Sequence, residues 1–222
     1  MTENRVAALA SGGLDSCVML GELAKTYGEV FPVYVRSGLR WEETELAVLR
    51  DFVGALRNRE VKSVRVMRVP MEDVYGNHWS TGGNPIPGYH EPDAVWEIPG
   101  RNLMLIAKAA VWCRLRNIGV IALGSLRSNP FSDATPEFFD RLQEALRTGL
   151  DMELTILRPL ANLHKSEIIR LGERYPLQLT LSCANPVGRD HCGECGKCRE
   201  RINAFVEAKV VDRTRYARRV VT

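Results

Sequence analysis

Ser11-Gly12-Gly13-Leu14-Asp15-Ser16 directly follows the apolar run 6–10, and this stretch decides how the N-terminal half of the chain folds. A short buried strand that ends in two glycines and leads into a helix forms a cradle for phosphate, because glycine lets the backbone approach an anion closely. The first N–H groups of the helix point at that anion, and the helix dipole adds about half a positive charge there. The alternative is an ordinary glycine-rich turn.

The spacing of this hexapeptide differs from that of the Walker P-loop and from the Gly-x-Gly-x-x-Gly of dinucleotide-binding folds. It resembles the SGGxDS signature of the PP-loop ATP pyrophosphatases, which split ATP into AMP and pyrophosphate. The resemblance implies that the chain binds ATP and Mg²⁺ at this turn.

Apolar runs and helical periodicities alternate along the rest of the chain. The patterns predict strands at 6–10, 30–35, 64–69, 120–124 and 154–157, and helices at 14–26, 42–56, 102–117, 136–148 and 165–175. Such alternation predicts right-handed βαβ units and an α/β fold, with a Rossmann-like doubly wound sheet of about five mostly parallel strands.

Regularity is lost over 70–100, where glycines and prolines gather with the aromatics Tyr75, Trp79, Tyr89 and Trp96. A loop of this length inside a compact domain is usually functional or disordered. We predict that it is a lid that covers the substrate. The alternative is a surface excursion that packs on its own aromatic side chains.

The bulk composition excludes some classes of protein. With 30 Lys and Arg against 27 Asp and Glu, the net charge of +3 is too small to indicate a nucleic-acid-binding protein. The basic stretch 213–219 predicts a solvated or subunit-contacting tail, with RNA contact as the alternative. The chain has neither a signal-peptide pattern nor an apolar run of about 18 residues. We therefore expect a cytoplasmic protein with neither a membrane nor a nucleic acid as partner.

Cys183, Cys192, Cys195 and Cys198 are clustered near the C-terminus. In a reducing compartment clustered thiols indicate a metal site rather than disulfides, and four thiolates satisfy tetrahedral zinc. An iron–sulfur cluster is the alternative, because spacing alone does not exclude it. His191 could compete as a ligand, although four sulfurs make it unnecessary.

Two further sequence expectations concern cysteines and domains. Cys17 and Cys113 lie in apolar helical settings, so we predict that both are core residues rather than nucleophiles. We predict a PP-loop ATP-binding domain over 1–180 and a small helical zinc-binding region over 181–222.

With the phosphate cradle at one end and the cysteine cluster at the other, the chain resembles the 7-cyano-7-deazaguanine synthase family of queuosine biosynthesis. The likeness also includes Pro99-Gly-Arg-Asn102 and the segment 157–172, Leu-Arg-Pro-Leu-Ala-Asn-Leu-His-Lys-Ser-Glu-Ile-Ile-Arg-Leu-Gly. It implies an ATP-dependent C–N ligase with a structural zinc ion, commonly a homodimer. The implied reaction converts 7-carboxy-7-deazaguanine and ammonia to 7-cyano-7-deazaguanine through an acyl-adenylate and an amide, with release of AMP and pyrophosphate.

The resemblance also implies roles for single residues. It assigns catalysis to Asp15, Arg101 and Lys165, where a plain helix-surface charge is the alternative for the lysine. Gly124 ends a strand at the edge where open α/β sheets bind ligands. The implied nucleotide-binding set is Leu9, Ala10, Ser11, Gly12, Gly13, Leu14, Asp15, Ser16, Tyr34, Val35, Asn102, Gly124 and Lys165. Within that set the backbone of Tyr34 and Val35 would read the edge of adenine.

Two segments depart from the family pattern. Residues 37–41 read Ser-Gly-Leu-Arg-Trp where the family usually shows Tyr-Gly-Gln-Arg-His, and residues 125–138 lack its acidic, tyrosine-rich run. Trp41 or Phe131 could stack on a planar base. The departures favour either a divergent synthase or a paralogue that adenylates another carboxylate, or a tRNA base, for amidation or thiolation. A zinc-stabilised RNA- or protein-binding module with a degenerate ATP site is the alternative from another class.

Overall fold

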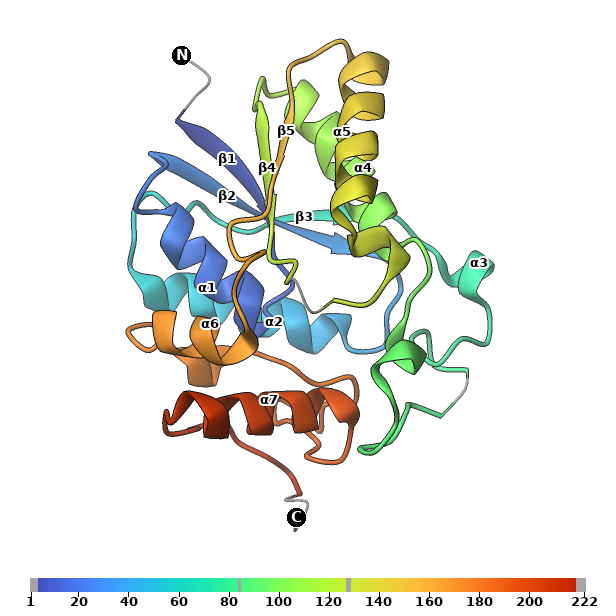
Figure 1. Ribbon diagram of the computed structural model, residues 1–222, viewed down its shortest axis with the longest axis vertical. Coiled ribbons are helices and arrows are strands. Elements are labelled where there is room, and N and C mark those ends of the chain that lie inside the picture. The colour runs from blue at the N-terminus through green and yellow to red at the C-terminus, as the bar shows by residue number, and fades with distance from the viewer. Residues whose placement is uncertain (1–3, 84, 127–128, 219–222) are drawn as a thin grey trace.

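Figure 1 shows a computed structural model of the protein, which describes residues 4–83, 85–126 and 129–218. Five strands form one sheet in the order β3-β2-β1-β4-β5, and every neighbouring pair is parallel. Their bounds are Arg5–Leu9 (β1), Glu29–Arg36 (β2), Arg65–Arg68 (β3), Val120–Leu123 (β4) and Thr155–Leu157 (β5). The predicted doubly wound α/β fold is confirmed.

Helices connect the strands on both faces of the sheet. They are α1 (Leu14–Leu23), α2 (Glu42–Leu56), α3 (Glu72–Tyr75), α4 (Arg101–Arg114), α5 (Pro136–Leu150), α6 (Lys165–Leu171) and α7 (Gly196–Ala208). The bounds predicted for α2 are those observed, whereas α6 ends before the predicted Tyr175. The chain leaves the helix at Gly172, where a β-carbon would lie 2.4 Å from Val18, and Pro176 disfavours helical backbone at Tyr175.

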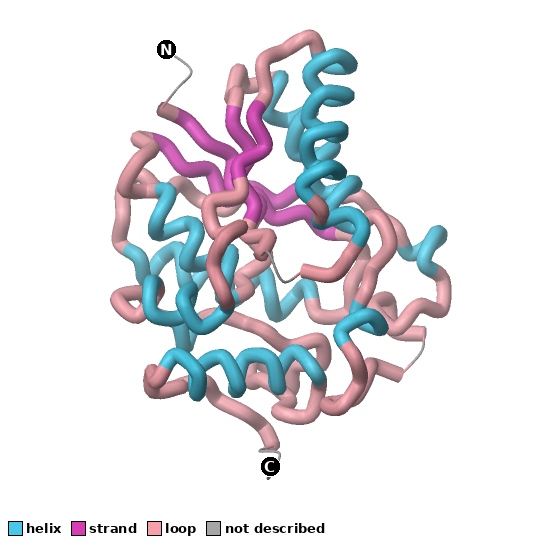
Figure 2. Tube along the Cα trace, viewed as in Figure 1, coloured by secondary structure: helices cyan, strands magenta, loops and turns pink. Residues whose placement is uncertain are grey.

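The sheet separates two apolar cores, which is why β1 reads as an unbroken apolar run. Val6 and Ala8 face a core that α1, α2, α6 and α7 complete, whereas Ala7 and Leu9 face a second core closed by α4 and α5. Figure 2 shows these helices on opposite sides of the strands, with α7 at the far end from α5.

A third cluster joins the 70–100 segment to the cysteine region. Trp79 stacks on Trp41 with ring centroids 5.6 Å apart and meets Trp96 edge-on at 5.2 Å. All three belong to the same buried cluster as the four clustered cysteines. Arg199 of α7 donates hydrogen bonds to the carbonyl oxygens of Tyr89 and Glu91. Among the described residues of the segment, 70–83 and 85–100, the two tryptophans are thus packing residues. The lid role stays a prediction.

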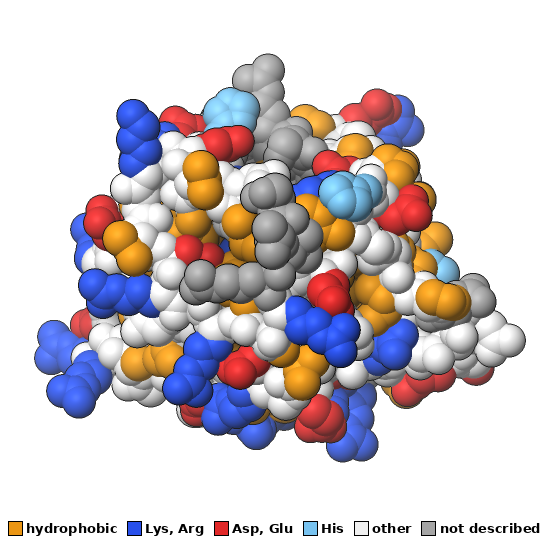
Figure 3. Space-filling model, turned by 90° about the horizontal axis from the view of Figure 1, so that it is seen from below, with side chains coloured by type: hydrophobic (Ala, Val, Ile, Leu, Met, Phe, Trp, Pro, Cys, Tyr) orange, Lys and Arg blue, Asp and Glu red, His pale blue; other side chains and the backbone are white. Residues whose placement is uncertain are grey.

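The C-terminal tail folds back on its own chain. Ala217 N–H donates to the carbonyl oxygen of His191, and Arg218 pairs with Glu194 at 3.1 Å. Arg213, Arg215 and Arg218 are nonetheless exposed, which agrees with the solvated tail that the sequence predicted. Subunit contact stays a prediction, and Arg219 lies outside the described residues. Acidic and basic side chains are interspersed on the face seen from below in Figure 3. No described helix has the length and apolar character needed to cross a bilayer.

Candidate active site

A pocket of about 220 Å³ opens at the carboxyl ends of β1, β2 and β4. Strand order reverses beside β1, and open α/β sheets bind ligands at such a switch point. Most of the residues that the sequence predicted to bind nucleotide or catalyse line this pocket: Leu9, Ala10, Ser11, Gly13, Asp15, Ser16, Tyr34, Val35, Arg101, Asn102 and Gly124. Gly12, Leu14 and Lys165 do not.

The turn after β1 is shaped by its own hydroxyls. Ser11 Oγ accepts a hydrogen bond from Gly13 N–H at 3.3 Å, and Ser16 Oγ donates to the Gly13 carbonyl oxygen at 3.0 Å. Gly12 has φ +79°, and a β-carbon there would lie 2.7 Å from the backbone oxygen of Glu45. Gly12 therefore lets the turn lie against α2, while Leu14 is buried in the core.

Gly124 brings a second strand end against the turn. A β-carbon on Gly124 would lie 3.2 Å from Ser16 N, in the first turn of α1. The end of β4 can therefore approach the N-terminus of α1.

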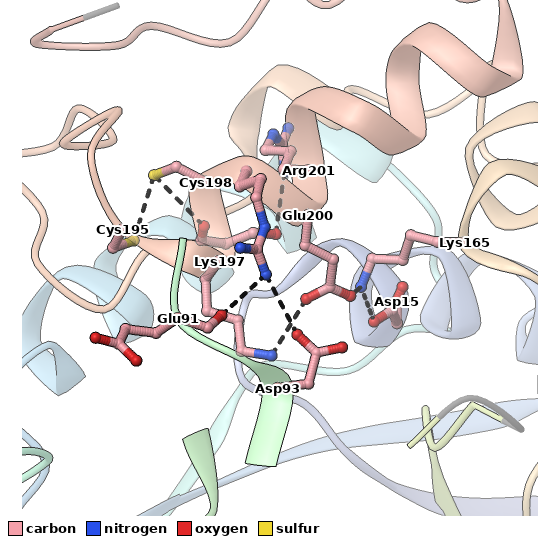
Figure 4. A network of polar contacts seen from close by, with 11 residues as sticks. Asp15, Glu91, Asp93, Lys165, Cys195, Lys197, Cys198, Glu200 and Arg201 are labelled. Atoms are coloured by element: carbon pink, nitrogen blue, oxygen red, sulfur yellow. Dashed lines mark hydrogen bonds and ion pairs between the residues drawn. The ribbon is translucent and has the colours of Figure 1, made fainter. Parts of the chain in front are cut away.

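Lys165 reaches the pocket through Asp15, which it contacts at 2.6 Å, and it also pairs with Glu200 of α7 at 3.2 Å (Figure 4). Burial acts to lower the pKa of Lys165, but the two carboxylates outweigh burial and raise that pKa, so the lysine is charged. Lys165 in turn lowers the pKa of Glu200 to about 2. The plain surface charge considered for Lys165 is thus excluded, because its side chain is only 18% exposed.

Two polar atoms of the pocket residues are buried without a hydrogen-bond partner in the described part of the chain: Asp15 Oδ1 and Arg101 Nε. A free carboxylate oxygen is the ligand that Mg²⁺ prefers, and a free guanidinium N–H suits an anion. Asn102 fixes this end of α4, because its backbone N–H and side-chain amide both bond to Asp133. The pocket residues therefore fit a magnesium nucleotide.

Sequence reasoning missed two acidic residues of α2 that line the pocket, Glu42 and Glu45. Glu45 is 8% exposed, and its Oε2 accepts a hydrogen bond from Tyr34 Oη at 2.9 Å. Burial raises the pKa of Glu45 to about 7, against the opposing effects of Arg101 and Tyr34. The sequence did carry a signal that Glu45 is buried. It precedes the buried Leu49 and Phe52 by four and seven residues, so it lies on the same face of the helix as these core residues.

Both segments that depart from the family pattern contribute to the pocket. Leu39 comes from the first, and Ser125 and Asn129 come from the second, of which residues 127 and 128 lie outside the described part. Neither Trp41 nor Phe131 lines the pocket; both pack in the tryptophan and cysteine cluster. Stacking of one of these rings on a bound base stays a prediction.

Cys183, Cys192, Cys195 and Cys198 converge in the predicted cluster. Their sulfur atoms all lie within 4.8 Å of one another, and all four are buried and free of disulfides. Thiolates that share one zinc ion at about 2.3 Å stand roughly 3.8 Å apart. The Cys195–Cys198 and Cys192–Cys198 sulfur distances are 3.5 and 3.8 Å, so the cluster fits a single ion.

His191 lies outside that cluster, because its Nε2 accepts a hydrogen bond from Ser182 N–H at 2.9 Å. Cys17 and Cys113 are core residues as predicted; burial raises the pKa of both thiols, that of Cys113 to about 12.

The cysteine cluster is tied to the phosphate turn. Leu181 N–H donates to the Gly12 carbonyl oxygen at 2.8 Å, and Leu181 lies two residues before Cys183. Arg201 of α7 is fully buried and holds the same segment, because it donates to Thr180 Oγ1 at 2.8 Å and to Ser182 Oγ at 3.3 Å.

Three features define a PP-loop enzyme of the adenine nucleotide α-hydrolase-like class: the parallel sheet, the glycine and hydroxyl turn after β1, and the half-buried Asp–Lys pair at the switch point. Solved structures share this fold. One is a 4-thiouridine synthetase in an RNA complex with bound ATP (TM-score 0.52, 16% identity, 92% of this chain and 50% of that one). Another is the U34-tRNA thiolase NcsA from Methanococcus maripaludis with its 4Fe–4S cluster (TM-score 0.51, 15% identity, 94% and 68%).

Within that class, residues 5–209 match the family described as "Queuosine biosynthesis protein QueC", and the chain belongs to this family. The 7-cyano-7-deazaguanine synthase of Acidobacterium capsulatum is 30% identical, over 99% of this chain and 100% of its own length. The enzyme of the same name from Methanopyrus kandleri is 34% identical, over 94% and 96%. The chain is thus an ATP-dependent enzyme of the 7-cyano-7-deazaguanine synthase family.

Proposed function

We propose that this enzyme converts 7-carboxy-7-deazaguanine and ammonia to 7-cyano-7-deazaguanine, with release of AMP and pyrophosphate. The proposal is carried by one pocket that is lined by the phosphate turn and Asp15 together with the buried Glu45 and the half-buried Arg101. It is supported by full-length similarity to synthases of this name.

The chemistry explains why ATP is needed. A carboxylate is a poor electrophile, because oxide would have to leave. Attack of its oxygen on the α-phosphorus of ATP expels pyrophosphate and makes an acyl-adenylate, from which ammonia can displace AMP to form an amide. A second ATP activates the amide oxygen in the same way, and loss of AMP leaves the nitrile.

The pocket residues divide this work between them. The N–H groups of the phosphate turn and the guanidinium of Arg101 stabilise the charge that develops on pyrophosphate. Lys165 holds Asp15 in place, so that Asp15 Oδ1 is available to Mg²⁺. The metal ion would supply further charge neutralisation at the phosphates.

We further propose that the four-cysteine cluster holds structural zinc. In a four-iron cluster each thiolate binds a different iron atom, so the sulfurs must stand further apart than around one ion. Separations within 4.8 Å favour the single ion. Elemental analysis of the purified protein should give about one zinc per chain, whereas several irons with visible absorption would contradict the assignment.

The direct test of the reaction uses pure enzyme with the deazaguanine acid, ATP, Mg²⁺ and ammonium. We expect AMP, pyrophosphate and a product lighter than the amide by one water, measured by mass spectrometry. AMP formation without any change in the deazapurine would contradict the proposal.

A second candidate, a paralogue that adenylates a different acid, is favoured by one observation: Leu39, Ser125 and Asn129 of the divergent segments line the pocket. A pyrophosphate-release screen over planar carboxylic acids distinguishes the two, because only the paralogue would prefer another acid. Thiolation of a tRNA base is disfavoured, since the spare thiols of Cys17 and Cys113 are buried with raised pKa values. Cys17→Ala should therefore leave ATP turnover intact.

We also propose a cytoplasmic homodimer, as the family resemblance implies. Light scattering of the purified protein measures the subunit number directly. A monomer under assay conditions would contradict the dimer without affecting the proposed reaction.

A further inference from the structure

The titratable side chains that line the pocket are mostly committed to other contacts. Asp15 is paired with Lys165, and the Glu42 carboxylate accepts from Ser37 N–H and lies 3.6 Å from Arg36. Glu45 is different, because among the described residues no charged side chain forms an ion pair with it; its side-chain partners are neutral, the Tyr34 hydroxyl and the Trp41 side chain.

Glu45 is held rigidly against the phosphate turn. Its backbone oxygen occupies the space that a side chain on Gly12 would need, and its carboxylate lines the same pocket as Ser11 and Asp15. Tyr34 Oη has one proton to donate, and it donates to Oε2. The hydroxyl therefore orients the carboxylate and leaves Glu45 with unused capacity to accept a proton.

The surroundings of Glu45 set its proton affinity. Arg101 of α4 and the Tyr34 hydroxyl of β2 favour the charged form, whereas burial and the neighbouring Glu42 of α2 disfavour it. The buried thiol of Cys17 faces it from α1. The balance places the pKa of Glu45 at about 7, where a carboxylate can both take up and release a proton at neutral pH.

The proposed reaction demands such a group. Every N–H proton of ammonia is lost on the way to a nitrile. Neutral ammonia that attacks an acyl-adenylate becomes a protonated amine. The adenylated amide loses one of its two remaining N–H protons to give a neutral imidate, and it loses the other as AMP leaves. A base near the reacting nitrogen is therefore needed in both halves of the sequence.

We propose that Glu45 is the general base that removes protons from the substrate nitrogen, with Tyr34 as its positioning residue; this inference rests on the proposed function. In the amide step Glu45 takes a proton from the added amine as the carbonyl re-forms, and the C–O bond to AMP breaks with its electron pair leaving on the phosphate oxygen. In the nitrile step the amide oxygen displaces pyrophosphate from the second ATP. Glu45 then takes the N–H protons in turn, passing each to water, as AMP departs and C≡N forms.

The first experiment separates activation from proton removal in Glu45→Gln, which keeps the shape of the side chain and can still accept from Tyr34. We expect acid-dependent exchange of labelled pyrophosphate into ATP to stay within about 3-fold of wild type, because adenylation needs no base at nitrogen. Formation of amide from the acid, and of nitrile from the supplied amide, should fall by about 10²- to 10⁴-fold.

Glu43→Gln is the matched control, because Glu43 lies on the same helical turn but its side chain is 82% exposed. It should behave as wild type in both assays. Thermal unfolding of each variant confirms that the fold is kept. Parallel loss of exchange and amide formation in folded Glu45→Gln would overturn the proposal, and so would full nitrile formation.

The second experiment tests Tyr34. Tyr34→Phe removes the hydrogen bond that favours the carboxylate form, so the acid limb of the pH profile for amide formation should move up by about one pH unit. The rate should recover at higher pH, which a merely structural role of Tyr34 would not produce. An unmoved acid limb would overturn the positioning role. If wild-type enzyme shows no exchange with the deazaguanine acid, the proposed function itself fails, whatever Glu45 does.

Discussion

At the scale of single residues, the decisive contact joins Asp15 to Lys165 across 150 positions of sequence. The lysine is held between two carboxylates, one on α1 and one on α7, so it is charged and fixed in position. Asp15 keeps one buried oxygen free for a cation. We propose that this pair makes the phosphate-binding turn a site for activating ATP.

Asp15→Asn is expected to lower kcat/KM for acid-dependent AMP formation at least about 100-fold, because the amide offers a weaker ligand to Mg²⁺ and no charge to Lys165. The melting temperature should stay close to that of wild type. Glu200→Gln is the matched control, because it removes the other partner of Lys165 and leaves Asp15 intact. Equal losses in both variants would show that the lysine, and not Asp15, carries the effect.

Glu45 makes stability depend on pH. Its pKa is raised in the folded protein from 4.5 to about 7, so the folded state binds more protons than the unfolded chain in that window. The free energy of unfolding should therefore fall as pH rises from 4.5 to about 7, by up to about 3 kcal/mol. Glu45→Gln should flatten this part of the curve in urea titrations. A wild-type curve that rises through the window relative to the variant would contradict the shifted pKa.

At the scale of elements, α7 carries three kinds of contact within one turn. Cys198 belongs to the four-cysteine cluster, Glu200 binds Lys165 beside the pocket, and Arg201 anchors the segment before Cys183 (Figure 4). Successive helical residues point in different directions, so one short helix can contact three structural units. We infer that displacement of α7 would disturb all of them together.

Arg201→Met should destabilise the protein by roughly 2–4 kcal/mol, because Thr180, Thr214 and a backbone carbonyl lose a buried charged donor. For a chain of this size that corresponds to a fall in melting temperature of roughly 5–15 °C. Arg199→Met is the control, because Arg199 lies on the same helix but bonds to the 70–100 segment. This variant should lower the melting temperature much less. Similar shifts in both variants would mean that burial of Arg201 does not matter.

At the scale of the whole molecule, the two apolar cores of the sheet and the tryptophan and cysteine cluster meet around the phosphate turn. The contact between Leu181 N–H and the Gly12 carbonyl oxygen links this turn to the segment that leads into the four-cysteine cluster. A well-packed C-terminal region should thus help to hold the phosphate turn in the conformation that binds ATP.

Removal of the metal with a chelator should therefore lower the melting temperature and weaken ATP binding several-fold in calorimetry. The physical reason is that the segment 181–183 loses its fixed end, and with it the hydrogen bond that holds Gly12. Zinc added back in stoichiometric amount should restore both properties. Unchanged ATP affinity in metal-free, folded protein would show that the two regions are independent.

The sequence by itself determined the sheet and its helices, the phosphate turn and the cysteine cluster, because each depends on residues that are close together in the chain. The local patterns are the apolar periodicity of the strands and helices, Gly12-Gly13 after a strand, and cysteines a few residues apart. Only the tertiary structure decided that Glu45 is a buried pocket residue, that Trp79 and Trp96 are packing residues, and that Lys165 meets Asp15. Burial, desolvation and pairing depend on what distant segments place nearby. The acidic first turn of α2 has the same sequence pattern whether its side chains face water or the interior. Only the packing of other segments around it distinguishes an exposed glutamate from a buried one.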